Sequence, residues 1–390
     1  MRIVHLVDRP AEIGGVPTYL AELLPALRDR GVESVVLSGD ASVRELAGAR
    51  CVHVPEVAAE SARLGAEAAG RLRAAVGSAG ADVVYAHLAS SPGAVLAAAE
   101  QAPVAVYAHD YYAVCPGSMR YLHRSETLCV EGPGLRCFWR AYTERSTNRR
   151  PDRLVRAYAR VRAWRDVWPR VSRVFVASPF VAELLRGDGV PQEALRVVPY
   201  FVRPEAAPPT APEHDVLYLG RLVAAKGVHV LLRALAALDG VTATIAGDGP
   251  ERQALVALSG RLGLAGRVRF TGWIPPAERP RLLAATRVLA LPSLWDEPFG
   301  IVGVEALSAG VPVVGSAVGG IPSWLEEGAG GSLVPRGDST ALAAALRRLL
   351  DDRSVHADQS SRARAAASRF SVERHLELLL PELRAAAGSD

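Results

Sequence analysis

The sequence predicts an α/β protein with two doubly wound domains, each built on a parallel sheet. The chain has 390 residues, and at about 150 residues per domain this length corresponds to two or three domains. Short apolar segments alternate with helical stretches, as in successive βαβ units. The apolar segments are nearly continuous, which is typical of strands covered on both faces.

In the first half, the alternation begins at the N-terminus. The expected strands are Ile3–Val7, Val32–Leu37, Val83–His87, Val104–His109 and Val174–Ala177. The expected helices are Pro17–Arg28, Ser61–Val76 and Ala94–Glu100. We assign residues 1–200 to an N-terminal Rossmann-like domain that carries a Cys- and Arg-rich insertion at about 111–170.

A proline-rich segment without strand or helix pattern, residues 201–213, is the predicted linker. The alternation restarts in residues 214–370, the predicted C-terminal Rossmann-like domain. Its expected strands are Asp215–Leu219, Val241–Ala246, Val268–Phe270, Val288–Pro292 and Val311–Gly315, the last of which should close the series. Its expected helices are Val228–Leu238, Glu251–Leu262, Pro276–Thr286 and Gly300–Ser308. Residues 371–390 hold one more amphipathic helix, which we expect to cross back to the N-terminal domain.

Composition and charge exclude several classes of protein. Basic residues number 45 and acidic residues 41, so the net charge of +4 gives little reason to expect nucleic acid. No apolar run approaches the roughly 18 residues of a membrane span, and four cysteines do not make a disulfide scaffold. We therefore expect a cytoplasmic protein. The first strand is not followed by G-x-G-x-x-G, which argues against a dinucleotide dehydrogenase.

A pair of cations follows the first strand of the second domain. Arg221 and Lys226 are separated by four residues, and Gly220 before them allows a sharp turn. Lys226 is the only lysine among 45 basic residues, which suggests a site that needs a compact ammonium, although chance placement is the alternative. Two cations ahead of a helix N-terminus suit a diphosphate, and surface charge in a loop is the competing interpretation.

Two glutamates separated by seven residues form a second candidate site. Glu297 precedes a turn at Pro298 and Gly300, and Glu305 lies in the helix that begins near Gly300. Carboxylates accept hydrogen bonds from sugar hydroxyls, and free N–H groups at the helix start can receive phosphate. Together these features suit a nucleotide sugar. An ordinary capped surface helix is the alternative.

These segments resemble the retaining glycosyltransferases of family 4, the glycosyl transferases group 1. The E-x7-E spacing of Glu297 and Glu305 is similar to the family motif, and further similar segments lie in order along nearly the whole chain. They are GRLVAAKG (220–227), GDGPER (247–252), SAVGGIP (316–322), Gly14-Gly15 and His109-Asp110. The resemblance implies the GT-B fold, in which two Rossmann-like domains face a central cleft. It also implies that the C-terminal domain holds the donor and the N-terminal domain the acceptor.

The resemblance further implies a role for each matching residue. Arg221 and Lys226 would neutralise the donor diphosphate, Glu305 would bind the ribose, and Glu297 would bind the donor sugar. His109 would lie near the reacting sugar, so the implied catalytic set is Arg221, Lys226, Glu297 and His109. The implied donor-binding set is Gly14, Gly15, Gly220, Arg221, Lys226, Gly247, Glu297, Phe299, Gly300, Ile301, Val302 and Glu305.

The implied activity is that of a metal-independent hexosyltransferase that retains anomeric configuration. The donor is a nucleotide-diphosphate sugar, with UDP favoured over GDP, and the acceptor is a hydroxyl of a glycan, a lipid-linked sugar or a small natural product. The alternatives are a GT-B sugar-nucleotide epimerase and an inactive sugar-nucleotide binding protein. No cofactor is expected, because the nucleotide sugar is a substrate.

The insertion leaves two further questions open. Cys115, Cys129 and Cys137, with His123 between them, are one set of ligands for a structural zinc, but the tight C-x2-C pairs of strong zinc sites are absent. Free thiols or an acceptor loop are the alternatives. Residues 136–173 contain twelve arginines, three acidic residues and interleaved aromatics. Such a segment suits an anionic membrane surface, the steering of a phosphorylated acceptor, or a solvated helix packed on the domain.

Overall fold

The computed structural model describes the chain except residues 11–14, 60–61, 88–90, 204–211 and 389–390. By its internal contacts the chain divides into two units. Unit 1 comprises Met1–Arg124, Cys129–Tyr200 and Val372–Asp390, and unit 2 comprises Ser125–Leu128 and Phe201–Ser371. Most of the predicted linker lies outside the described residues.

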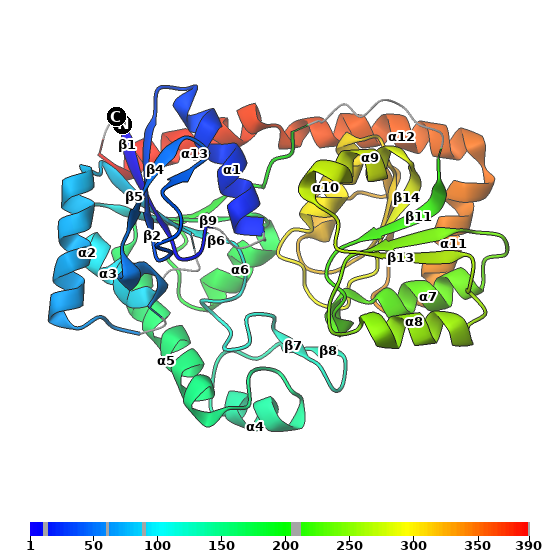
Figure 1. Ribbon diagram of the computed structural model, residues 1–390, viewed down its shortest axis with the longest axis horizontal. Coiled ribbons are helices and arrows are strands. Elements are labelled where there is room, and N and C mark those ends of the chain that lie inside the picture. Colours follow the sequence, from blue (N-terminus) through cyan, green and yellow to red (C-terminus); the bar gives the residue numbers. More distant parts are fainter. Residues whose placement is uncertain (11–14, 60–61, 88–90, 204–211, 389–390) are drawn as a thin grey trace. The chain divides into compact units, whose positions relative to one another are not determined.

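Unit 1 is built on an eight-stranded sheet of order β10-β9-β6-β5-β1-β2-β4-β3 (Figure 1). All neighbouring strands are parallel except β3 and β4. The strands are β1 (Arg2–Val7), β2 (Glu33–Ser38), β3 (Glu45–Leu46), β4 (Ala49–His53), β5 (Val83–His87), β6 (Val104–Ala108), β9 (Arg173–Val176) and β10 (Leu195–Val197). Every residue of β5 and β6 is buried, as expected for central parallel strands. Two further short strands are β7 (Tyr121–Leu122), in unit 1, and β8 (Thr127–Leu128), in the Ser125–Leu128 segment assigned to unit 2.

The helices of unit 1 include the last helix of the chain. Its α13 contacts β5, β6, β9 and α1, and it buries Leu376, Leu379 and Leu383 at helical spacing. The helices are α1 (Gly15–Arg28), α2 (Ala66–Ala79), α3 (Pro92–Ala99), α4 (Arg136–Thr143), α5 (Pro151–Val167), α6 (Pro179–Gly187) and α13 (Val372–Ala386). The C-terminal segment therefore completes the core of the first unit.

Unit 2 has a six-stranded parallel sheet of order β13-β12-β11-β14-β15-β16. The strands are β11 (His214–Leu219), β12 (Ala243–Ala246), β13 (Val268–Gly272), β14 (Thr286–Leu291), β15 (Val313–Ser316) and β16 (Gly331–Val334). The helices are α7 (Val228–Ala236), α8 (Arg252–Arg261), α9 (Arg279–Ala284), α10 (Ile301–Ser308), α11 (Ser339–Asp351) and α12 (Arg353–Ala367). The prediction that Val311–Gly315 closes this sheet is wrong, because β16 pairs beyond β15 and α11 and α12 follow.

The order of each sheet fixes where its loops diverge. In unit 2, the chain runs outward through β12 and β13 on one side of β11, and then through β14, β15 and β16 on the other. The strand order therefore reverses between β11 and β14, and doubly wound sheets generally bind ligands at the carboxyl ends of the strands at such a reversal. In unit 1 the same reversal lies between β1 and β5.

Candidate functional site

The loop after β11 is interlocked with the loop after β12. Backbone hydrogen bonds run from Gly220 N to Ala246 O, 3.0 Å, and from Leu222 N to Asp248 O, 2.8 Å. A Cβ on Gly247 would lie 1.8 Å from the Gly220 carbonyl oxygen, so only glycine permits this approach. Gly220 and Gly247 therefore lie against each other at the carboxyl ends of the adjacent strands β11 and β12.

Arg221 and Lys226 both extend from this loop. Arg221 is exposed, and the Tyr218 hydroxyl donates to its carbonyl oxygen at 2.8 Å. Within the described residues its guanidinium has no hydrogen-bond or ion-pair partner. Lys226 ends a short 3-10 turn and is followed by Gly227, whose φ is +68°. A Cβ on Gly227 would also lie 1.9 Å from the Pro292 carbonyl oxygen. Both the positive φ and this close approach therefore require glycine at this position.

Lys226, after β11, forms an ion pair with Glu297, after β14. Lys226 Nζ lies 2.6 Å from Glu297 Oε1, and Ser293 Oγ donates to the same oxygen at 2.6 Å. Glu297 is 6% exposed, and the Lys226 charge and the Ser293 hydrogen bond offset part of the cost of burying its carboxylate. Burial, and secondarily the Glu297 charge, raise the pKa of Tyr218 beneath the pair. The loops after β11 and β14 are therefore joined by this ion pair as well as by a backbone hydrogen bond from Leu294 N to Ala225 O, 2.8 Å.

The SAVGGIP segment supports the Glu297 backbone. Gly320 N donates to Glu297 O at 2.7 Å. Gly319 has φ +52°, and a Cβ there would lie 2.3 Å from the same oxygen. Trp324 Nε1 donates to Phe299 O at 2.5 Å. This segment holds the loop in place and offers no charged side chain of its own.

The predicted residues from Phe299 to Glu305 have different surroundings. The Phe299 side chain is buried, so only its backbone is available to a ligand. Gly300 has φ +85° and precedes α10, which presents the N–H groups of Ile301 and Val302 at its start. Glu305 lies in the second turn, where Arg279 Nη1 of α9 is 3.7 Å from its Oε1. Ser293 and Arg279 are site neighbours that the sequence reasoning missed, because neither belongs to a recognisable spacing.

The predicted donor set includes two glycines of unit 1, of which the structure describes only Gly15. Gly14 lies outside the described residues. Gly15 begins α1, and a Cβ there would have no atom within 4 Å. The fold itself therefore does not require glycine at this position.

His109 follows β6 and has both ring nitrogens within reach of protein groups. Its Nδ1 lies 2.6 Å from the Tyr200 hydroxyl, and its Nε2 lies 3.0 Å from Nδ1 of His87. Burial, with a smaller contribution from His375, lowers the pKa of His109 to about 3. His109 is therefore a neutral imidazole held in one orientation.

His109 belongs to a chain of histidines that sequence reasoning did not find. His87 Nε2 lies 3.3 Å from His5 Nδ1, and His5 Nε2 lies 3.3 Å from Ser34 Oγ. His5 and His87 occupy adjacent strands β1 and β5, which explains how residues far apart in sequence meet. Burial lowers the pKa of His5 to about 3 and that of His87 well below its usual value. The only sequence signal was histidine inside otherwise apolar strands.

Asp110, directly after His109, is a carboxyl with an unusual environment. Burial raises its pKa to about 6, although the Tyr112 N–H, which donates to its Oδ1 at 2.7 Å, and the Arg160 charge act in the opposite direction. Arg160 stacks over the Tyr112 ring at 3.5 Å and donates to the Tyr112, Cys115 and Pro116 carbonyl oxygens. One buried arginine thus fixes the start of the insertion.

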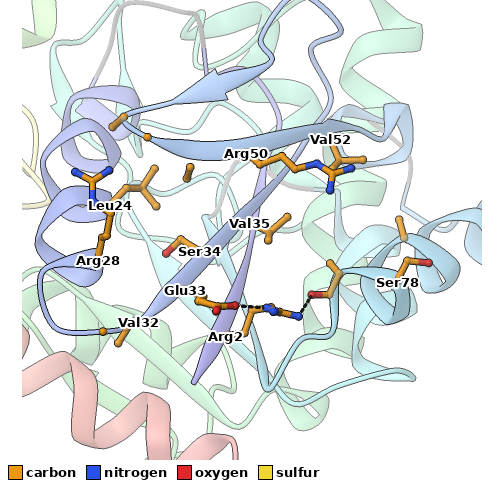
Figure 2. Close-up of a pocket in the computed structure, with 16 residues that line it drawn as sticks. Arg2, Leu24, Arg28, Val32, Glu33, Ser34, Val35, Arg50, Val52 and Ser78 are labelled. Atoms are coloured by element: carbon orange, nitrogen blue, oxygen red, sulfur yellow. Dashed lines mark hydrogen bonds and ion pairs between the residues drawn. The ribbon is translucent and has the colours of Figure 1, made fainter.

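A pocket of about 750 Å³ lies elsewhere in unit 1, around the start of β2 (Figure 2). Arg2, Arg28, Arg50 and Ser34 are among its lining residues, and Arg2 Nε donates to Glu33 Oε2 at 2.6 Å. None of the predicted site residues lines it. Because it lies at the amino ends of the strands, it is not the crevice that doubly wound sheets use for ligands.

The cysteines of the insertion are free thiols. Cys129 Sγ accepts a hydrogen bond from Arg140 Nη1 at 3.2 Å, and burial raises the pKa of Cys137. In the part of the chain that the structure describes, no three His, Cys, Asp or Glu side chains are arranged to hold a metal ion. The zinc alternative therefore gains no support from the geometry, since a positive guanidinium adjoins one of the proposed ligands.

Comparison with known families matches both halves of the chain. A family described as "Glycosyltransferase Family 4" matches residues 13–206, and one described as "Glycosyl transferases group 1" matches residues 205–366. The D-inositol 3-phosphate glycosyltransferase of Mycobacterium marinum is 38% identical over 188 residues, 45% of this chain and 39% of that protein. A lipopolysaccharide core biosynthesis glycosyltransferase of Rhizobium meliloti is 40% identical over 141 residues, 36% of this chain and 40% of that protein. The matched segments thus span about two-fifths of these relatives.

Solved structures match over the whole length. Anabaena HepE in complex with UDP has a TM-score of 0.73 at 23% identity and covers 99% of this chain and 100% of that one. Sucrose-phosphate synthase from Thermosynechococcus elongatus has a TM-score of 0.74 at 20% identity, with full coverage of both chains. These similarities establish the GT-B fold. Together with the two family matches over residues 13–366, they show that the chain belongs to the group 1 glycosyl transferases.

Proposed function

We propose that this chain is a retaining hexosyltransferase that moves a sugar from a nucleoside-diphosphate sugar to an acceptor hydroxyl. The observation that carries the proposal is the Lys226–Glu297 ion pair, 2.6 Å long, at the strand-order reversal of unit 2. It presents an ammonium and a carboxylate at the place where doubly wound sheets bind ligands. The chemistry of the pair matches the two halves of such a donor, a diphosphate and a sugar.

Each charged group can serve two partners at once. A lysine ammonium has three N–H donors, so Lys226 can keep one on Glu297 and direct the others to phosphate oxygens. Glu297 has a second carboxylate oxygen for a sugar hydroxyl. Arg221 is exposed on the same loop, and its guanidinium can donate two parallel N–H hydrogen bonds to a phosphate. Glu305, paired with Arg279, is the proposed ribose contact.

The proposed reaction needs no metal and no side-chain base. The bond between the anomeric carbon and the phosphate oxygen breaks, and a bond to the acceptor oxygen forms on the same face. The acceptor proton passes to an oxygen of the departing diphosphate. Arg221, Lys226 and the N–H groups at the start of α10 would stabilise the charge that develops on that diphosphate. His109, neutral and fixed in orientation, is proposed to lie beside the transferred sugar without exchanging protons.

UDP is the nucleoside diphosphate we propose, in preference to GDP. The Anabaena HepE structure was solved with UDP and also with UDP-glucose, and its fold covers 99% of this chain. We propose that unit 1 receives the acceptor, a hydroxyl of a glycan, a lipid-linked sugar or a small molecule. The location we propose is the cytoplasm.

A thermal-shift panel of UDP, GDP and ADP tests the donor directly. A ligand at about 100 times its Kd adds about 2.7 kcal/mol to the free energy of unfolding. We expect UDP to raise the Tm most, with no change when EDTA is added. Incubation with UDP-sugars, with and without a panel of glycosides, then tests transfer, and NMR of the product anomeric proton tests retention. If no nucleoside diphosphate stabilises the chain, the proposal is wrong, and an epimer formed without acceptor would favour the epimerase.

A further inference from the structure

An apolar stripe faces solvent on α4, which lies away from the large sheet of unit 1 (Figure 1). Leu135, Trp139 and Tyr142 follow one another at the spacing of a single helix face. Their exposed fractions are 80%, 72% and 53%. Val130, just before the helix, is 81% exposed. We call Val130, Leu135, Trp139 and Tyr142 the α4 surface.

Other side chains of α4 are held in place by packing and an ion pair, so the stripe does not belong to a loose segment. Ala141 is fully buried, and the Phe138 ring lies 5.1 Å from that of Tyr158 on α5. Arg140 Nη2 lies 2.8 Å from Glu131 Oε1. Of the eight large apolar side chains exposed in the described residues, four belong to the α4 surface. Exposed apolar side chains gathered in one place, with polar residues around them, are typical of interaction sites.

Positive charge borders the α4 surface. Arg145, Arg149, Arg150 and Arg153 are exposed, and within the described residues no carboxylate pairs with any of them. The Tyr142 hydroxyl donates to the Arg149 carbonyl oxygen at 3.0 Å, which ties the arginine-bearing loop to the stripe. The local acid Asp152 pairs with Arg156 instead. The surface therefore combines aromatic and aliphatic side chains with uncompensated cations.

This combination selects the kind of partner. Tryptophan and tyrosine favour the boundary between lipid headgroups and acyl chains, and guanidinium groups bind phosphates. Among the described helices we find no candidate for a membrane-spanning segment, and α4 has only eight residues. We propose that the α4 surface docks unit 1 onto an anionic membrane, with Leu135 and Trp139 at headgroup depth and the four arginines on lipid phosphates. The proposal is independent of the sugar-transfer activity proposed above.

Vesicle flotation with the full chain and no nucleotide tests the docking. We expect binding to vesicles of equal parts phosphatidylcholine and phosphatidylglycerol, and little binding to phosphatidylcholine alone. Leu135→Ser with Trp139→Ser should abolish binding to the anionic vesicles. Arg149→Ala, Arg150→Ala and Arg153→Ala together should weaken it about 100-fold, since each arginine near an anionic surface contributes about fivefold. All five residues lie at the surface, and unchanged Tm values would show that these variants fold.

Matched controls come from unit 2. Trp273→Ser removes another exposed tryptophan, and Arg261→Ala, Arg269→Ala and Arg353→Ala remove the same charge from other exposed positions. Both should bind as the wild type does. The proposal is overturned if the wild type does not bind anionic vesicles or binds neutral vesicles equally well. It is also overturned if the control variants lose as much binding as the α4 variants. Retention on RNA or on an acidic protein without vesicle binding would also overturn it. A chain that floats with vesicles but lacks transfer activity would contradict only the proposed function.

Discussion

Lys226 Nζ lies 2.6 Å from Glu297 Oε1, although the two residues are 71 positions apart in the chain. The contact joins the loop after β11 to the loop after β14. Glu297 is buried and Lys226 is a quarter exposed, so the lysine both neutralises a buried carboxylate and remains open to a ligand. Any variant of one residue therefore changes the electrostatics of the other.

Lys226→Met should separate catalysis from folding. We expect the transfer rate to fall by about 10²–10³, the usual loss when one donor to a developing anion is removed. We also expect a cost of about 1–3 kcal/mol in the free energy of unfolding, because Glu297 loses its cation in a buried place. Steady-state kinetics and urea unfolding measure the two effects.

The double variant Lys226→Met with Glu297→Gln is the control for the folding term. Removing both charges should recover most of the stability and none of the activity. If Lys226→Met turns over at close to the wild-type rate, the proposed diphosphate clamp is wrong.

Substitutions of Glu297 and Glu305 should have different effects on nucleotide binding and on sugar transfer. Glu305→Ala should weaken binding of the bare nucleoside diphosphate, because the proposed contact is with ribose. Glu297→Gln should leave that binding intact or tighten it, since the Lys226 ammonium loses its internal anion, while transfer falls. Calorimetric titration with UDP distinguishes the variants. Equal losses of UDP affinity in both would show that the assignment of sugar and ribose contacts is incorrect.

The long buried strands were predictable, because a strand that is buried on both faces consists almost entirely of apolar residues. The prediction for Val83–His87 matches β5, and that for Asp215–Leu219 matches β11 within one residue. The strands β4 and β16 were missed. The sequence ARCVH mixes polar residues into β4, and GSLV in β16 is too short and too rich in small residues to stand out.

The candidate site was predictable only as a set of residues. Their spacing and the resemblance to the glycosyl transferase family singled out Arg221, Lys226, Glu297 and Glu305 as candidates. They did not identify Ser293, Arg279 or the neighbours of His109. Those partners are brought together by strand order and loop closure, which act across the whole unit and leave no local pattern.

The buried histidines should make folding stability sensitive to acid. His5, His87, His109 and His375 have lowered pKa values, about 3 for His5 and His109 and about 4 for His375. Below about pH 6.5 these histidines therefore bind protons in the unfolded chain but stay neutral in the native state. Stability should fall as the pH drops from about 6.5 toward these values, by up to about 1.4 kcal/mol per pH unit for each histidine. Asp110, whose pKa is raised to about 6, acts in the opposite direction and stabilises the native state as the pH falls from about 6 to 4. This effect of one carboxyl is smaller than the summed effect of the four histidines.

Urea unfolding between pH 7 and about 5 measures this slope. His5→Gln removes one buried group and should reduce the slope by up to about 1.4 kcal/mol per pH unit. The matched control is His53→Gln at an exposed position, which should leave the wild-type slope unchanged. A stability that is flat with pH in the wild type would show that these imidazoles are protonated in the native state.

Two glycines of the predicted donor set should respond oppositely to alanine. Gly247→Ala places a Cβ 1.8 Å from the Gly220 carbonyl oxygen at a φ of +145°, so the two loops must separate. We expect lower stability together with weaker UDP binding. Gly15→Ala places its Cβ where no atom lies within 4 Å, at the start of α1. Folding should be unchanged or improved by about 0.4–1 kcal/mol, because alanine restricts the unfolded chain.

Activity of Gly15→Ala then tests whether this backbone approaches the donor. If it does, the added methyl group occupies the space that the diphosphate needs, and transfer should fall while the Tm holds. Kinetics with the UDP-sugar and thermal unfolding of the same preparation provide the two measurements, with Gly65→Ala as a control at another glycine that has open space around it. If Gly15→Ala retains full activity, Gly15 makes no close contact with the donor. Its match to the family position would then reflect the start of a helix and no contact with phosphate.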